Sequence, residues 1–164
     1  MVESGRSYGL SESGDRMGIA EFLEARFDED EEAAQNAAGW DLSGSVRDAG
    51  LWRREGVNSV IDNSRRLVVH GDGPEPDGSQ AEHIVRHDPA RSLREVAVKR
   101  ELLKAHREVV LRADDGTGNY DTARLCRSCA PDHAHIRENW PCPTVLHLAS
   151  VYDDHPDCQT EWRP

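Results

Sequence analysis

The chain has 164 residues, a length that fits one compact domain. Hydrophobic residues make up 37% and aromatic residues 5%, so the core must be small, and such a core often needs a metal or oligomerisation. A net charge of -11 disfavours general nucleic-acid binding, which needs clustered lysine and arginine, and it suits a basic protein partner better.

Residues 1–17 are rich in serine, glycine and acids, which predicts a disordered leader before a single small domain over 18–164. The start of the chain lacks the basic and apolar regions of a secretory signal. No run approaches the roughly 20 apolar residues that span a bilayer. We therefore expect a cytoplasmic protein without a membrane partner, in which a Cys-x2-Cys pair favours metal over a disulfide.

The first ordered element is expected to be an amphipathic helix over 18–37. Its apolar residues follow the i, i+3, i+4, i+8 spacing of one helix face: Ile19, Phe22, Leu23 and Phe27. The acidic residues are densest over 24–32, where they would form the solvated face of the same helix.

The pattern changes in a sheet region over 40–70. Short runs with apolar residues are separated there by turn residues, which predicts a small antiparallel β-meander. The runs cover 51–54, 58–61 and 66–70. A loop rich in proline and glycine follows over 71–78.

Further helices are expected in a helical, zinc-binding part over 79–164. A short helix covers 79–87. A long one starts after Asp88, a good N-cap, with Pro89 at the first helical position, and runs to about Leu111. Its buried stripe would consist of Leu93, Val96, Ala97, Leu103 and Val110.

A Gly/Asp/Asn loop over 114–120 leads into a cysteine segment, and a last helix begins after Cys142. Together these elements predict an α+β fold. It would consist of an N-terminal helix, a small antiparallel β-meander, and two or three helices with a zinc-tied C-terminal segment.

The cysteine segment has a spacing that implies specific chemistry. Cys126 and Cys129 enclose two residues, so one tight turn presents both thiolates to one ion, and Cys142 supplies a third ligand. We favour His106 as the fourth ligand, because it would tie this segment to the long helix. The alternatives are His133, His135, His147 and Cys158.

Three cysteines and one histidine would fill a tetrahedral zinc site, whereas a catalytic site usually keeps one position open for water. His106-x-Glu108 upstream of the cysteine pair is similar to part of a deaminase signature, but Leu125 stands where that signature has proline. We therefore assign no catalytic residue. His83 and His87 share one helix face, yet two ligands alone rarely make a site.

Several pieces of the chain form one ordered pattern: Glu21-Phe22-Leu23 with its acidic continuation, 81–91, 99–106, the cysteine segment ending in 141–144, 152–156 and 161–164. This pattern resembles an uncharacterised domain-of-unknown-function family of small proteins from actinobacteria and their phages. The resemblance implies that His106 and the three cysteines belong to the family pattern. Cys158 departs from it at a position where an aromatic residue is expected.

Three functions follow in order of preference. The first is a non-enzymatic interaction or regulatory module with structural zinc and a protein partner, favoured by the filled ligand set and the acidic composition. The second is a small metal-dependent enzyme acting on nucleotides or nucleic acid. The third is a nucleic-acid-binding zinc ribbon, which would need Arg124, Arg127 and Arg137 on one exposed face.

Overall fold

The structure is a computed structural model that describes residues 17–39, 50–69, 76–114, 120–130 and 139–163. Several predictions fall outside these residues: nearly all of the leader, 40–49 of the sheet region, most of the loops at 71–78 and 114–120, and both His133 and His135. Within the described residues the fold is α+β, as the sequence predicts.

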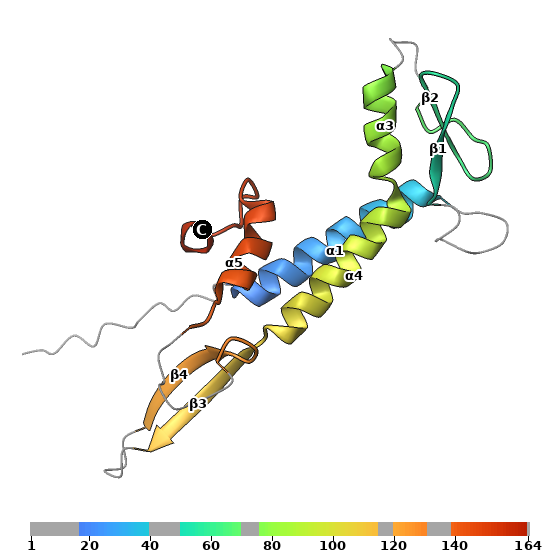
Figure 1. Cartoon of the computed structure of the whole chain (residues 1–164). Coiled ribbons are helices and arrows are strands. Elements are labelled where there is room, and N and C mark those ends of the chain that lie inside the picture. The colour runs from blue at the N-terminus through green and yellow to red at the C-terminus, as the bar shows by residue number, and fades with distance from the viewer. Residues whose placement is uncertain (1–16, 40–49, 70–75, 115–119, 131–138, 164) are drawn as a thin grey trace, which may run out of the picture.

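An antiparallel pair of helices forms the frame of the molecule (Figure 1). α1 (Ile19–Ala38) lies against α4 (Pro89–Ala105). Ion pairs join the two helices. Arg100 of α4 forms an ion pair with Asp28 of α1 at 2.5 Å, and it also pairs with Glu24 and Glu31 of the same helix. The acidic run of α1 is thus partly a contact surface for α4, in addition to the solvated face that its composition predicts.

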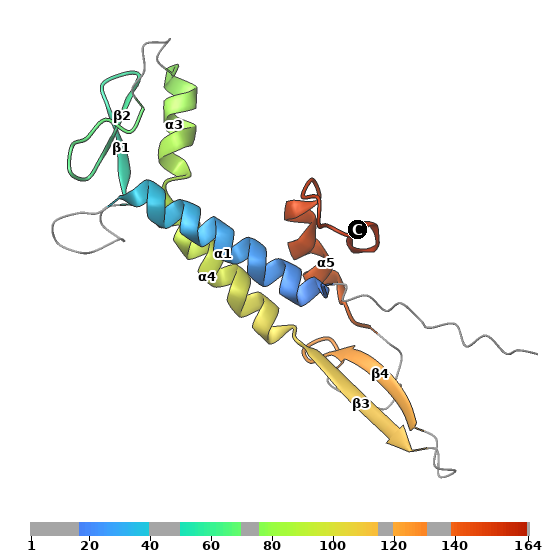
Figure 2. The same ribbon diagram turned by 180° about the vertical axis from the view of Figure 1, so that it is seen from behind.

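A small lobe stands at the end of the frame where α1 finishes (Figure 2). It contains the antiparallel hairpin of β1 (Trp52–Glu55) and β2 (Ser59–Asp62), with α3 (Gly78–Arg86) beside it. The third predicted run of the meander contributes only an isolated bridge between Leu67 and Ile61. The meander is therefore a two-stranded hairpin with a short bridging segment.

The opposite end of the frame carries the C-terminal elements (Figures 1 and 2). A second antiparallel hairpin, β3 (Glu108–Asp114) and β4 (Tyr120–Cys126), continues beyond α4. α5 (Pro143–Ala149) and two short 3₁₀ turns, Ser150–Tyr152 and Thr160–Trp162, pack beside the start of α1. No helix in the described part of the chain is long and apolar enough to cross a membrane.

The prediction that the long helix runs to about Leu111 is wrong. α4 ends just before His106, and the residues that follow form β3. Two successive β-branched residues, Val109 and Val110, favour a pleated strand over a helix, and Val109 lies opposite Leu125 of β4. Val110 is consequently 53% exposed on the hairpin instead of buried on a helix.

Three other members of the predicted buried stripe are buried or half-buried, but the prediction for Ala97 is wrong. Val96 and Leu103 are buried against α1, Leu93 is half-buried and Ala97 is exposed. The predicted loop at 114–120 lies between β3 and β4. The sequence pattern did not predict β4, because this strand lacks a clear alternation of apolar and polar residues.

The hydrophobic core lies between α1, α4 and α5. Phe22 and Phe27 of α1 are fully buried, and Phe22 packs against Trp162 with ring centroids 5.2 Å apart. Val145 of α5 joins them, and the same cluster extends to Cys126 and to other cysteines near the chain's end. The core thus reaches the segment that the sequence assigns to metal.

The start of α4 depends on Asp88, which is 7% exposed. Its Oδ1 accepts a hydrogen bond from the backbone N–H of Arg91 at 2.7 Å, and its Oδ2 accepts one from that of Trp52 at 3.4 Å. Asp88→Ala should lower the free energy of unfolding by about 1–2 kcal/mol, because both donors lose their acceptor. Asp88→Asn keeps a cap oxygen and should lose much less. Equal stability of the two variants in urea unfolding would refute this role.

Asp62 closes the turn after β2 and makes stability depend on pH. Burial raises the pKa of Asp62, but hydrogen bonds from the backbone and guanidinium of Arg66 outweigh burial and hold it below the ordinary 3.8. A depressed pKa contributes stability above the unfolded-state value, and this is lost as pH falls through the folded-state value. Melting temperature measured between about pH 5 and pH 2 should therefore fall less steeply in Asp62→Asn than in the wild type. Asp154→Asn, at an exposed acid, should keep the wild-type slope.

Candidate metal centre

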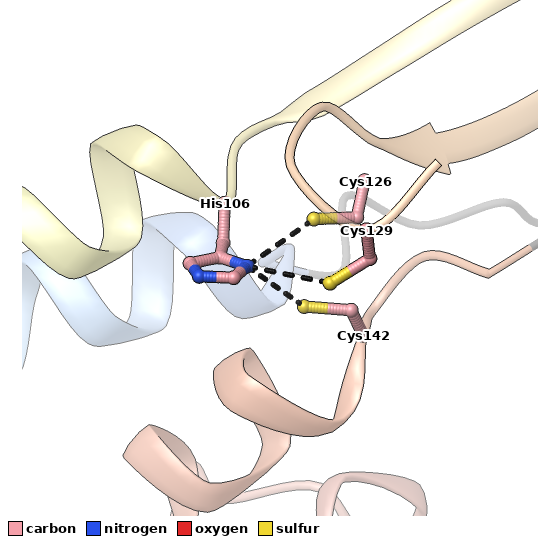
Figure 3. A group of neighbouring side chains, drawn as sticks. All are labelled: His106, Cys126, Cys129 and Cys142. Atoms are coloured by element: carbon pink, nitrogen blue, oxygen red, sulfur yellow. Dashed lines mark hydrogen bonds between the residues drawn. The ribbon is translucent and has the colours of Figure 1, made fainter. Parts of the chain in front are cut away.

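Four side chains from three segments converge where the core meets the second hairpin (Figure 3). His106 directly follows α4 and closes its last turn, with its backbone N–H bonded to the carbonyl of Leu102 at 3.0 Å. Cys126 ends β4, Cys129 lies in the turn that follows, and Cys142 directly precedes α5.

The cysteine turn is fixed by hydrogen bonds to both neighbouring elements. Ser128 donates from its hydroxyl to the carbonyl of Ala105 at 2.6 Å, so the turn satisfies one of the carbonyls left open at the end of α4. The backbone N–H of Cys126 donates to Oδ1 of Asn139 at 2.7 Å. Sequence reasoning identified neither Ser128 nor Asn139. A hydroxyl inside a Cys-x2-Cys turn was the available signal for the first, and none existed for the second.

The distances match a tetrahedral metal site. Nδ1 of His106 lies 3.5 Å from Sγ of Cys126, 3.5 Å from Sγ of Cys129 and 3.6 Å from Sγ of Cys142. All four ligand atoms lie within 4.8 Å of one another. Zinc bonds of about 2.3 Å to sulfur and 2.0 Å to nitrogen give an edge of about 3.6 Å in a tetrahedron.

Hydrogen bonding alone does not account for this arrangement. A ring nitrogen carries at most one hydrogen, so it donates well to one sulfur and not to three at once. A cation at the centre would instead be shared by all four ligand atoms. The group therefore has the geometry and the donor types to hold a metal ion.

The electrostatics of the thiols lead to the same conclusion. Burial raises the pKa of Cys126, but the backbone N–H groups of Cys129 and Ser128, with help from the neighbouring thiols, lower it overall. Burial, together with the Cys126 and Cys142 side chains, raises the pKa of Cys129 to about 12. The neighbouring thiols thus oppose a negative charge on Cys129, and a divalent cation bound beside it would offset this opposition.

The donor set fills a tetrahedron and sits partly at the surface. Cys126 and Cys142 are fully buried, His106 is half-buried, and Cys129 is exposed. If these four groups bound one tetrahedral ion, three thiolates and one imidazole would take all four positions around it.

The other ligand candidates lie elsewhere or cannot be placed. His147 is exposed on α5 and does not belong to the group. Cys158 is buried in the core, with its Sγ 3.9 Å from the carbonyl of Gln159. His133 and His135 lie outside the described residues.

The features that suggested an enzyme do not form a site among the described residues. The carboxylate of Glu108 accepts from both Nε and Nη2 of Arg124, the latter at 3.1 Å. The rings of His83 and His87 lie 4.4 Å apart, but no third ligand joins them in the described ranges.

The arginines of the zinc-ribbon alternative are only partly placed. Arg124 pairs with Glu108, and Arg127 is exposed in the cysteine turn. Arg137 lies outside the described residues.

The chain was also compared with known proteins. No curated protein and no solved structure matches it. Residues 16–164 match a family of unknown function, which confirms that part of the resemblance seen in the sequence. The protein is therefore a member of DUF6221, a family of unknown function.

Proposed function

We propose that this protein is a cytoplasmic interaction or regulatory module that is stabilised by structural zinc and binds another protein. The filled set of three cysteines and one histidine is the observation that carries the proposal. A ligand set without an open position supports the fold and offers no site for a reaction.

Zinc is the metal that this donor set suits best. Thiolate and imidazole are its usual ligands in structural sites, and four of them in a tetrahedron satisfy it. The two charges of the ion would offset the mutual repulsion of the thiolates around Cys129. A reducing cytoplasm would keep those thiols available.

The metal would supply stability that this chain's small core lacks. The second hairpin makes most of its contacts within itself, and a two-stranded hairpin alone is marginally stable in water. His106 and Cys142 would connect it through the ion to α4 and α5. Because the unfolded chain has no preformed site, the free energy of metal binding becomes free energy of folding.

A role in binding a partner is supported better than catalysis. Glu108, the nearest carboxylate in sequence to the ligands, is held by Arg124, and the charge of three thiolates would weaken zinc as a Lewis acid. The acidic composition favours a basic protein over nucleic acid. The resemblance to small proteins of actinobacteria and their phages supports a regulatory or host-interaction role by analogy.

Purified, tag-free protein should contain one zinc per chain by elemental analysis, and a chelator should lower its melting temperature. Cys129→Ser should lose the metal and melt lower on the order of 10 °C, because metal binding contributes to folding. Cys158→Ser is the matched control, since it changes a cysteine of the same core that lies outside the cluster. This variant should keep its zinc and its sensitivity to the chelator. Wild-type protein without metal, or unchanged melting of Cys129→Ser, would refute the structural site.

Cobalt substitution separates a closed site from an open one. Tetrahedral cobalt(II) with thiolate ligands absorbs in the visible range, and the spectrum responds when a new ligand enters. Addition of azide should leave the spectrum of the cobalt protein unchanged. A spectral change would indicate an open position and favour the metal-dependent enzyme instead.

A further inference from the structure

The second hairpin has a free edge with a defined register. In an antiparallel pair, residues that exchange hydrogen bonds alternate with residues whose N–H and C=O point outward. The backbone N–H of Arg127 donates to the carbonyl of Arg107 at 3.0 Å, which sets this alternation. The outward groups of β3 therefore belong to Glu108, Val110, Arg112 and Asp114.

The edge of β4 is already engaged by the chain itself. The carbonyl of Arg124 accepts from the backbone N–H of Asn139 at 3.1 Å, and the N–H of Cys126 donates to the side chain of Asn139. These are the outward groups that the same alternation predicts for β4. On β3, no backbone hydrogen bond joins the outward groups to any other segment within the described ranges.

The β3 edge is also open in space. β3 lies on the side of the hairpin turned away from α5 in both views (Figures 1 and 2). Val110, the third residue of β3, is 53% exposed although it is β-branched and apolar. An unpaired edge of this kind is a template for another extended strand.

The side chains of β3 identify the strand that fits. From Glu108 to Arg112 the sequence is Glu-Val-Val-Leu-Arg, an apolar centre with opposite charges two residues on each side. An antiparallel copy centred on Val110 therefore sets Glu108 opposite Arg112, and Arg112 opposite Glu108. Opposite charges in facing positions stabilise a strand pair, and like charges destabilise it.

We propose that the partner of this module includes a second copy of the same chain, with the two β3 strands paired antiparallel about a twofold axis at Val110. The two Val110 residues then lie directly opposite each other. The N–H and C=O of each point out of its own hairpin, so each valine forms two backbone hydrogen bonds with the other. The Glu108–Arg112 pairs on either side do the same. Such an interface is isologous, since one surface serves both copies.

Pairing would also complete the apolar face of the hairpin. Val109, Leu111 and Ala123 are half-buried on one face beside the buried Leu125. Joining two hairpins makes this face continuous across a four-stranded sheet, and sheets of three or more strands with an apolar face are stable where a lone hairpin is marginal. Because the strands run antiparallel, the helical frames lie at opposite ends of the joined sheet.

Sedimentation equilibrium of the full chain over a range of concentrations tests this pairing. The wild type should approach twice the 18.3 kDa of one chain. Arg112→Glu should raise the dissociation constant at least about tenfold, because it creates two like-charge pairs per dimer. Glu108→Arg should do the same, and because it also removes the ion pair with Arg124 of β4, its effect is assigned to the interface by the mixing experiment. An equimolar mixture of the two variants should form a heterodimer, since every facing pair is then opposite in charge.

A backbone variant tests the hydrogen bonds directly. Val110→Pro removes only an outward N–H, so the β3–β4 ladder keeps its bonds while the dimer loses two. It should sediment as a monomer, and Val110→Thr, which keeps both the N–H and the β-branch, should remain a dimer. A monomeric wild type, or a dimer that survives both Arg112→Glu and Val110→Pro, overturns the inference.

The proposed dimer rests on the proposed function, in which this protein is a zinc-stabilised interaction module. Zinc content and chelator sensitivity are therefore measured on the same samples. A zinc-loaded wild type that stays monomeric overturns the β3 pairing and leaves the structural metal intact. A zinc-free dimer that responds to the charge variants as expected overturns the metal proposal alone.

Discussion

The convergence of three thiols and one imidazole is the constraint on which the rest of the C-terminal half depends. His106, Cys126 and Cys142 belong to three segments that make few other contacts with one another. The hydrogen bonds of Ser128 and Asn139 position the cysteine turn. They add little stability to the hairpin, and a two-stranded hairpin alone is marginally stable in water. A cation bound by all four ligand atoms would give these segments a common centre, in a chain whose core is short of apolar area.

Charge organises the other half of the fold. Arg100 and Lys99 of α4 pair with acids of α1, so several charges of the acidic run are matched across the two helices although their side chains remain partly exposed to solvent. Ion pairs at the surface are each weak and sensitive to salt. Their contribution here is mainly to fix how α1 lies against α4, while Phe22 and Phe27 provide the stabilising burial.

Signals in the sequence were enough for much of the architecture and for the grouping of His106 with three cysteines. The spacing of Phe22 and Phe27 predicted α1, Asp88-Pro89 predicted the start of α4, and the cysteine spacing with the family resemblance favoured His106. The β3–β4 hairpin was missed because the chain turns from helix to strand at Arg107 without a proline or glycine to mark it. Long-range pairing decided that boundary, and local propensity does not reveal such pairing.

Side chains at both ends of α4 connect the helix to other parts of the fold. Its first turn is capped by Asp88, which also bonds the lobe through the backbone of Trp52, and its last turn is closed by His106, whose ring belongs to the cysteine cluster. A helix of 17 residues is about 25 Å long. It cannot slide or rotate about its axis without disturbing one anchor or the other. The side chains at the two ends of α4 therefore connect the cysteine cluster to the β1–β2 lobe through one continuous helix.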